Sequence, residues 1–372
     1  MHLETEVAVI GGGLVGISLG YGLALQNIDS VVLDEGDDAI RASRGNFGLV
    51  WVQGKGLTLP AYTGWALRAF EQWGQFARQL EKETELNVAL EQNGGLYFCR
   101  TKEALAERAA NLATVKAQYD GPYDYDILDN STVRKLLPEI GPSVAGASYS
   151  KYDGQCNPIR LLQALHRAYA NRGGGYHPGN SVIGIERKAG KFILTTAKGK
   201  VVAERIALAS GLGNATLGTM LGVDIPVKPV RGQMLVTERV PKLFDYAMEQ
   251  VRQTDDGTLM LGGSWEDVGF DLTTTFDVTK RIADDATHFF PLLNDVRIIR
   301  SWSALRIITP DAAPIYEEVA PGAFLVTCHS GVSLAAIHAY ETAKWIAEGR
   351  IPKAMRPFGL HRFNTSEVRA AA

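Results

Sequence analysis

The segment Glu6-Val-Ala-Val-Ile-Gly-Gly-Gly-Leu-Val-Gly16 decides the fold. Residues 6–10 are mostly apolar and β-branched, which predicts a buried parallel strand. The glycines at 11, 13 and 16 then satisfy the pattern GxGxxG, and residues 17–26 continue with helical apolar spacing. A second apolar run, Ser30-Val-Val-Leu-Asp34, places a carboxylate about 20 positions after the loop. This order of strand, glycine loop, helix, strand and acid predicts a Rossmann-type dinucleotide-binding unit.

Each part of this unit has a physical task. Gly11 permits a sharp turn, Gly13 lets the backbone approach a pyrophosphate, and Gly16 lets the helix lie close to the sheet. The helix N-terminus offers N–H groups and the positive end of its dipole to phosphates. Asp34 can accept hydrogen bonds from ribose hydroxyls, and by itself the unit fits either NAD or FAD. The predicted cofactor-binding residues in this unit are Gly11, Gly13, Leu14, Val15, Gly16, Asp34 and Glu35.

The composition is that of an ordinary globular protein. The 372 residues suggest roughly two domains, and the net charge of -3 argues against a nucleic-acid partner. Cys99, Cys156 and Cys328 lie far apart, which argues against a disulfide scaffold or a metal site and fits reduced thiols in the cytoplasm. Residues 7–28 carry no charge, but six glycines and an acidic flank argue against a signal peptide or membrane span.

Several separated segments follow one pattern along nearly the whole chain. Together they resemble the D-amino-acid oxidase-like flavoproteins, a family that includes glycine and sarcosine oxidases. Segments 41–51 and 328–332 are similar to the flavin-bearing β subunits of D-hydroxyproline dehydrogenases and opine (octopine, nopaline) oxidases, and to the third subunit of hydrogen cyanide synthase. The matching segments are Gly11–Gly16 with Asp34, Ser43-Arg-Gly-Asn46, Asp153-Gly154 with Pro158, Ala209-Ser-Gly211, Pro229-Val-Arg-Gly-Gln233, Trp302–Asp311 and His329-Ser-Gly-Val332.

The resemblance implies an α/β fold with a Rossmann-like FAD-binding domain. A second, α+β substrate domain on a mainly antiparallel sheet would interleave with it, because strands and helices alternate again at 226–299 before the chain returns to the first domain. The expected FAD-binding domain comprises residues 1–85, 150–225 and 300–372. The expected substrate domain comprises residues 86–149 and 226–299.

The resemblance also implies the chemistry, which is dehydrogenation of a C–N bond with hydride transfer from the α-carbon to flavin N5. The expected substrate is a secondary-amine amino acid, D-hydroxyproline or an opine. The chain would be the catalytic β subunit of a hetero-oligomeric complex in the cytoplasm. The expected partners are an α subunit and a small ferredoxin-like γ subunit, with FMN or an iron–sulfur cluster carried by or shared with a partner.

Two departures from the family bear on how the flavin is attached and on which electron acceptor is used. Monomeric sarcosine oxidases bind flavin through a cysteine near the Thr-Pro-Asp segment, whereas no cysteine lies within 157–327 here, so FAD is expected to be non-covalent. Those enzymes also place an oxygen-activating lysine where this chain has Met260, which favours a dehydrogenase that passes electrons onward. The alternatives are a self-sufficient glycine- or sarcosine-type oxidase producing hydrogen peroxide, an NAD(P)-dependent dehydrogenase, and a non-catalytic scaffolding subunit.

Arg306 is the candidate catalytic residue. It matches the family arginine that holds the substrate carboxylate, and its planar guanidinium can make two parallel hydrogen bonds to such a group. The alternative is a structural arginine paired with Asp311. The candidate substrate-binding residues are Trp51, Gln53, Lys55 and Trp302. For the two tryptophans, packing in the core is an equally good explanation.

The remaining predicted cofactor contacts come from the resemblance. The loop after the second strand would line the flavin or its pyrophosphate, unless it is only a solvated loop. Gly331, Val332 and Ser333 would open the last helix, at about 333–347, and turn its N-terminus toward the N1–C2=O edge of the flavin. The alternative is a plain helix start capped by Ser330 or Ser333. The other candidates are Ser43, Arg44, Asn46, Val182, Ala209, Ser210, Gly211 and the flavin-adjacent His329; no metal ligand is predicted.

Overall fold

A mixed sheet, parallel around the glycine loop, forms the centre of the fold. The computed structural model describes residues 2–36 and 41–363. Strand β1 (His2–Ile10) is parallel to both of its neighbours, β11 (Gly199–Leu208) and β2 (Ser30–Leu33). Within the described residues this sheet has eight strands, with a main path β17-β18-β11-β1-β2-β8. Its other strands are β8 (Gly175–His177), β9 (Val182–Lys188), β10 (Lys191–Thr196), β17 (Ile315–Ala320) and β18 (Ala323–Thr327).

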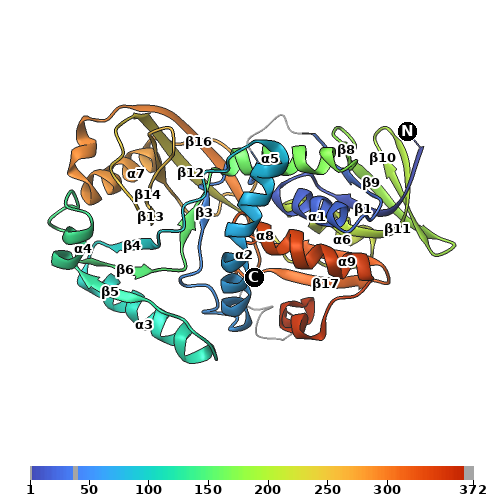
Figure 1. Ribbon diagram of the computed structural model, residues 1–372, viewed down its shortest axis with the longest axis horizontal. Helices are drawn as coiled ribbons and strands as arrows, with labels where there is room; N and C mark the ends of the chain where they lie inside the picture. The colour runs from blue at the N-terminus through green and yellow to red at the C-terminus, as the bar shows by residue number, and fades with distance from the viewer. Residues whose placement is uncertain (1, 37–40, 364–372) are drawn as a thin grey trace.

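Helix α1 (Leu14–Leu25) accounts for the long uncharged stretch near the N-terminus. It is buried on nearly all sides and packs against α5 (Pro158–Asn171) and the helical segment at 335–348 (Figure 1). A Cβ on Gly22 would lie 2.1 Å from the carbonyl oxygen of Ala339, so glycine permits this close approach. A helix buried all round is a core helix. Among the helices in the described parts of the chain, none is long and apolar enough to span a bilayer.

The last helical segment differs from the expected single helix. Residues 331–334 form a turn, and the helix begins only at α8 (Ala335–Ile337). A π-helical turn, η3 (His338–Thr342), follows, and α9 (Ala343–Glu348) ends at Gly349 with a φ of 70°. The helical spacing of apolar residues could not reveal the π-helical turn, because one extra residue in a single turn shifts the buried face of the helix only locally.

Mainly antiparallel sheets form the second part of the molecule, at the opposite end from β9 and β10 (Figure 1), and β13 with β4 is their one parallel pair among the described residues. In one of them β12 (Lys228–Arg239) pairs with β16 (Ile298–Ile308), and β15 (Thr258–Gly262) and β14 (Val251–Gln253) complete the order β14-β15-β12-β16. A further sheet has the order β13-β4-β6-β5. Its strands are β4 (Gly95–Cys99), β5 (Asp126–Asp129), β6 (Gly146–Ser150) and β13 (Ala247–Met248).

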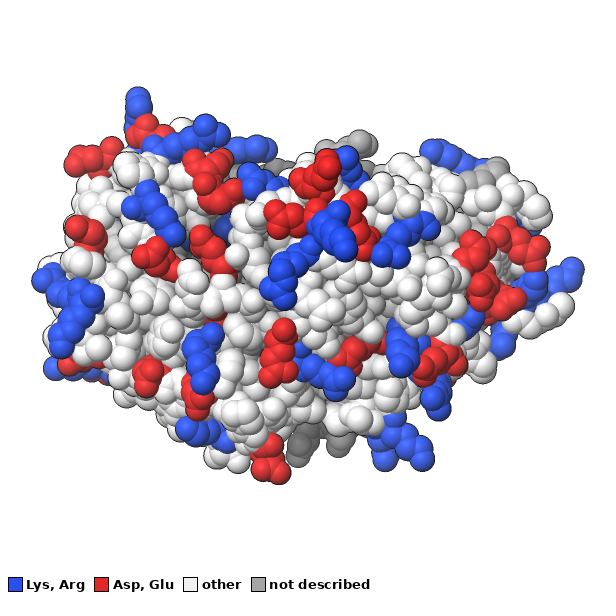
Figure 2. All heavy atoms as spheres, viewed as in Figure 1, with Lys and Arg blue, Asp and Glu red and all other residues white. Residues whose placement is uncertain are grey.

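Helices cover these sheets, and the predicted α/β fold class is confirmed. The division into two interleaved domains stays a prediction, and β16 runs across the expected boundary at residue 300. On the face shown in Figure 2, basic and acidic side chains are interspersed. The remaining elements are α2 (Ala61–Thr84), α3 (Lys102–Gln118), α4 (Asn130–Leu136), α6 (Asn214–Met220), α7 (Phe276–Phe289), β3 (Leu49–Val50) and β7 (Gly154–Gln155), with short 3-10 turns η1 (Gly211–Gly213), η2 (Pro291–Asp295), η4 (Lys353–Phe358) and η5 (Leu360–Phe363).

Candidate active site

The glycine loop has the geometry that its sequence predicts. Gly11 has a φ of +113°, and a Cβ there would lie 2.5 Å from the carbonyl oxygen of Ala209. A Cβ on Gly16 would lie 1.8 Å from the carbonyl oxygen of Gly11. The backbone N–H of Leu14, at the start of α1, donates to Ser43 Oγ over 2.9 Å. The loop after β2 therefore lies directly over the N-terminus of α1, where a phosphate would bind.

Asp34 is oriented by the same loop. Its Oδ2 accepts a hydrogen bond from the Gly12 N–H at 2.7 Å, and its Oδ1 accepts one from the Gly36 N–H at 2.9 Å. A carboxylate has about four acceptor sites, so these two bonds leave capacity for ribose hydroxyls. Glu35 forms an ion pair with Arg41 at the surface.

A cavity of about 600 Å³ extends from this loop. Its lining also includes Leu212, Phe270 and Cys328, which were not predicted. Gly16 and Arg44 do not line this cavity. Gly16 packs against the backbone of Gly11 instead. Of the predicted cofactor contacts, the cavity brings together Gly11, Gly13, Leu14, Val15, Asp34, Glu35, Ser43, Val182, Ala209, Ser210 and Gly211.

A second cavity, of about 370 Å³, adjoins the first. Ala42, Leu305 and Ile307 line both, so the two cavities meet at the 41–46 loop and at β16. The lining residues that sequence reasoning missed include Tyr97, Glu249 and Trp265. The predicted residues that line this second cavity are Asn46, Trp51, Lys55, Arg306, His329, Val332 and Ser333.

Arg306 reaches this cavity through a gap left by two glycines. A Cβ on Gly232 would lie 2.4 Å from Arg306 Nη1, and one on Gly263 would lie 3.2 Å from Nη2. Nη1 donates to the carbonyl oxygen of Ser264 over 2.8 Å, and the guanidinium carbon lies 4.8 Å from the ring centroid of Trp265. Burial lowers the pKa of Arg306, although the side chain stays charged at neutral pH.

The alternative of an Arg306–Asp311 pair is wrong. The carboxylate of Asp311 is bound instead by Arg362, with Nε 2.8 Å from Oδ2 and Nη2 3.0 Å from Oδ1. Among the ion pairs between described residues, none includes Arg306. The guanidinium is therefore available to an anionic group in the cavity.

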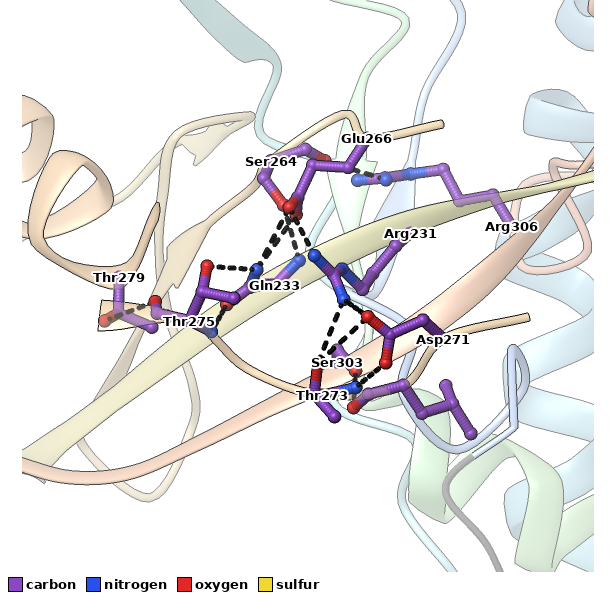
Figure 3. A network of polar contacts seen from close by, with 11 residues as sticks. Arg231, Gln233, Ser264, Glu266, Asp271, Thr273, Thr275, Thr279, Ser303 and Arg306 are labelled. Atoms are coloured by element: carbon purple, nitrogen blue, oxygen red, sulfur yellow. Dashed lines mark hydrogen bonds and ion pairs between the residues drawn. The ribbon is translucent and has the colours of Figure 1, made fainter. Parts of the chain in front are cut away.

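A polar network fixes the loop that carries the contacts of Arg306. Figure 3 shows Arg231 between two carboxylates, with Nη2 2.7 Å from Glu266 and Nη1 2.5 Å from Asp271. The backbones of Arg231 and Glu266 also exchange hydrogen bonds of 2.9 and 3.0 Å. Gln233 Nε2 donates to Glu266 over 3.0 Å, and Ser264 Oγ donates to the same carboxylate. These hydrogen bonds and ion pairs fix the positions of Ser264 and Trp265.

Lys55 and His329 both adjoin Ser330, the residue before the 331–334 turn. Lys55 Nζ donates to Ser330 Oγ over 2.8 Å, and burial lowers the pKa of Lys55. Burial, reinforced by Lys55 and Arg306, lowers the pKa of His329 to about 3. His329 is therefore neutral at physiological pH. It can donate or accept a hydrogen bond, but it does not add a charge to the cavity.

Neither serine of the turn caps the last helix. Ser333 Oγ accepts from the Trp51 N–H over 3.0 Å and donates to the carbonyl oxygen of Leu49 over 3.1 Å. The residue at the N-cap is Leu334, without a side-chain cap. The capping alternative is therefore wrong, and Ser333 instead ties the turn to the 49–51 segment. Gly331 lies beside α1, since a Cβ there would be 3.7 Å from Leu14 Cβ.

Gln53 and Trp302 support the site from outside its lining. Gln53 is buried, with Nε2 donating to Asp153 Oδ2 over 2.6 Å and Oε1 accepting from Arg108 Nη2 over 2.8 Å. Burial raises the pKa of Asp153 to about 7, against the effect of its backbone donors. Trp302 Nε1 donates weakly to the carbonyl oxygen of Gly45, at 3.5 Å. In residues 2–36 and 41–363, no group of acidic, histidine and cysteine side chains could hold a metal ion.

Comparison with known proteins assigns the class. The model of the FAD dependent oxidoreductase (DAO) family matches residues 6–347, and the chain belongs to this family. An opine oxidase subunit from Agrobacterium tumefaciens (strain Ach5) is 38% identical over 98% of this chain and 99% of its own length. The corresponding opine oxidase subunit from Rhizobium meliloti is 36% identical over the same shares. Hydrogen cyanide synthase subunit HcnC from Pseudomonas protegens is 26% identical, over 98% of this chain and 97% of its own.

Solved structures agree with this fold. The crystal structure of glycine oxidase from Geobacillus kaustophilus superposes with a TM-score of 0.88, at 22% identity, over 96% of this chain and 98% of that one. The predicted family and the predicted class, an FAD-dependent oxidoreductase, are both confirmed. The glycine cradle and the adjoining cavities fit FAD, because the cavity of about 600 Å³ runs from Gly11, Gly13 and the first residue of α1, where a pyrophosphate would bind, to the carboxylate of Asp34.

Proposed function

We propose that this chain oxidises a secondary-amine amino acid, either an opine or D-hydroxyproline, by hydride transfer from its α-carbon. The proposal rests on Arg306, a carboxylate-binding side chain without an ion-pair partner among the described residues, in the cavity that adjoins the dinucleotide cavity. The similarity to the two opine oxidase chains supports the same substrate class. When bound, FAD would supply the hydride acceptor.

In this proposal the protein binds and orients the substrate rather than transferring a proton in the rate-limiting step. Arg306 holds the substrate carboxylate, and Trp265 and the carbonyl of Ser264 fix the guanidinium in one orientation. The neutral ring of His329 lies beside the same cavity and adds no positive charge to it, and the substrate amine reacts in its neutral form. Trp51 and Tyr97 contribute apolar walls that limit the access of water.

We further propose that FAD is held non-covalently. Cys328 is the one cysteine among the residues that line the two cavities. Burial raises the pKa of its thiol to about 12. Because the thiolate is the reactive form, such a cysteine is a poor nucleophile toward a flavin.

The electron acceptor is proposed to be a partner subunit. The position of the family's oxygen-activating lysine is occupied by Met260, whose Sδ accepts a hydrogen bond from Arg252 Nη2 at 3.1 Å. Arg252 is buried and also contacts the carbonyl oxygen of Cys156, so its charge faces the protein interior. We propose α and γ partners with FMN or an iron–sulfur cluster, in the cytoplasm. The opine oxidase and hydrogen cyanide synthase relatives are subunits by name, which supports such an assembly.

The test is co-purification of the tagged chain with its native partners, followed by substrate screening. The proposal expects a yellow complex that oxidises an opine or D-hydroxyproline and reduces an artificial acceptor faster than oxygen. Vigorous hydrogen peroxide production by the isolated chain would instead support the self-sufficient oxidase. A colourless chain that turns over NAD(P) would overturn the proposal.

A further inference from the structure

The segment 51–55, between β3 and α2, carries two lining residues of the smaller cavity. Its backbone is fixed by Asp153, a fully buried carboxyl residue between β6 and β7. Asp153 Oδ1 accepts from the N–H groups of Val52 and Gln53, over 2.6 and 3.2 Å. Asp153 takes no part in binding the substrate carboxylate, yet its hydrogen bonds determine where this segment lies beside the cavity.

The side chain of Gln53 joins Asp153 to an arginine. Its Nε2 donates to Asp153 Oδ2 over 2.6 Å, and its Oε1 accepts from Arg108 Nη2 over 2.8 Å and from Ser148 Oγ over 2.6 Å. Gln53 and Ser148 are both buried. A carboxylate only accepts hydrogen bonds and a guanidinium only donates them, so the amide between them satisfies both in one orientation only.

This network reaches two walls of the smaller cavity. At one end is Trp51, the residue directly before the two backbone N–H groups that Asp153 binds. At the other end is Tyr97, because the guanidinium carbon of Arg108 lies 4.2 Å from the centroid of its ring. Trp51 and Tyr97 both line the cavity. A Cβ on Gly95 would lie 2.6 Å from Trp51 and 2.6 Å from Asp153, so the glycine lets both side chains pack against β4.

We propose that Asp153 is a positioning residue for the substrate. Through the amide and the guanidinium that follow it in the network, it fixes the walls formed by Trp51 and Tyr97. These walls bind the body of the substrate, whereas Arg306 binds the substrate carboxylate. This inference rests on the proposed function, in which the smaller cavity holds the substrate.

Asp153→Asn disturbs this network without changing the size of the side chain. If the new amide turns its oxygen toward the N–H groups of Val52 and Gln53, its NH2 group faces the NH2 group of Gln53. The opposite orientation points NH2 at the two backbone N–H groups, and a rotated Gln53 amide points NH2 at Arg108. Every arrangement brings two donors together, and a buried donor without an acceptor is costly. Adding Gln53→Glu places an acceptor opposite the new NH2 group, so the double variant should recover part of the loss; the carbonyl of Gly95 still loses its donor.

Two unreactive carboxylates, acetate and cyclohexanecarboxylate, test the proposal on the FAD-loaded complex. Neither has an amine to oxidise, and only the second has a ring that extends beyond Arg306 to the walls. Calorimetry is expected to show tighter binding of the cyclic compound, because its CH2 groups become buried. Asp153→Asn should reduce this preference by about 5-fold or more, which corresponds to the lower end of the cost of an unpaired buried donor. Arg306→Lys should weaken the binding of both carboxylates.

Two further variants separate positioning from general stability. Gln253→Leu removes another buried amide, which donates to the carbonyl oxygen of Pro241 over 2.9 Å and lines neither cavity. It should lower the melting temperature and retain the preference. Arg108→Met, at a half-buried position, should reduce the preference as Asp153→Asn does, and it covers the case in which Asp153→Asn does not fold. The FAD content is measured on each sample.

A retained preference in Asp153→Asn or Arg108→Met would overturn the inference, as would binding of neither carboxylate by the natural protein. A lost preference in Gln253→Leu would also overturn it, because general loosening would then be sufficient. Turnover of octopine and of D-hydroxyproline by the same complexes separates the two proposals. Oxidation together with a retained preference would overturn the role of Asp153 alone. A reduced preference without any oxidation by the natural complex would overturn the proposed function alone.

Discussion

Arg362 binds Asp311 with two nitrogen–oxygen distances of 2.8 and 3.0 Å, and this pairing leaves Arg306 to the cavity. Asp311 is five residues from Arg306 on the same stretch of chain, so a local pair was a reasonable expectation. The chain instead brings Arg362, from the C-terminal 3-10 turn η5, to bind it. Arg306, the proposed substrate clamp, is thus kept available by an ion pair that does not include it.

Arg306→Lys is expected to weaken substrate binding although the positive charge is kept. A lysine cannot reproduce two parallel hydrogen bonds or the stacking on Trp265. We expect kcat/KM to fall about 10- to 150-fold, the range for a lost hydrogen bond to a charged group. Steady-state kinetics measure this, and Arg300→Ala, an exposed arginine on the same strand, is the control. An unchanged kcat/KM in Arg306→Lys would remove the clamp from the mechanism.

Gly16→Ala is expected to impair FAD binding. The new methyl group would lie 1.8 Å from the carbonyl oxygen of Gly11, so the phosphate loop has to move. Overpacking of this kind costs about 1–3 kcal/mol. The ratio of flavin to protein absorbance after purification, together with the melting temperature, measures the effect. Gly184→Ala is a matched control, because the nearest atom to its Cβ would be 3.6 Å away, and it should retain full FAD.

Arg231→Met is expected to destabilise the protein by about 3–5 kcal/mol, since it leaves Glu266 as an unpaired and largely buried charge. Denaturant unfolding of Arg231→Met, of Glu266→Gln and of the double variant measures the coupling between the two. The double variant should lose much less than the sum of the single losses. Additive losses would show that the ion pair does not hold the loop. KM should also rise more than kcat falls, because Ser264 and Trp265 position Arg306.

The stability of the fold is expected to decline with acid through buried histidines. Burial lowers the pKa of His338 to about 3, from an unfolded value of about 6.5. The unfolded chain therefore binds a proton that the folded chain excludes. This contribution to stability is complete above about pH 6.5 and is lost as the pH falls toward 3, by up to about 1.4 kcal/mol per pH unit.

His338→Gln tests this pH dependence away from the active site. The side chain is fully buried, and its Nε2 lies 3.0 Å from the hydroxyl of Tyr316. Between pH 6.5 and 5, the free energy of unfolding should change less steeply in the variant than in the natural protein, whatever its absolute stability. Equal slopes in the two proteins would contradict the shifted pKa.

The sequence was sufficient to predict the glycine loop and the acid beside it, because both follow from local patterns. The loop from Gly11 to Gly16 and the acid at Asp34 follow one another in the chain, and backbone geometry alone defines them. Ala209–Gly211 and Val182 came from the family pattern, and they line the same cavity. Helix ends were harder to predict, since the turn at 331–334 depends on tertiary hydrogen bonds to Ser333.

The substrate side could be predicted only in part. Glu249 and Trp265 come from segments without a sequence motif, and the folding of separate strands brings them to Arg306. Gln53 was expected at the substrate, yet its amide is used by Asp153, Arg108 and Ser148. In an irregular loop, the order of polar and apolar residues does not show which side chains face a cavity. The sequence therefore could not show that Lys55 lines the cavity whereas Gln53 does not.

Leu305 and Ile307 line both cavities, and Arg306 stands between them on the same strand. Three consecutive residues thus line the two cavities in which we propose that the cofactor and the substrate bind. A displacement of this strand by one ligand changes the site of the other, and thermodynamic linkage requires the effect to be reciprocal. Cofactor affinity and substrate affinity are then not independent quantities: bound cofactor changes the affinity for the substrate by the same factor by which bound substrate changes the affinity for the cofactor.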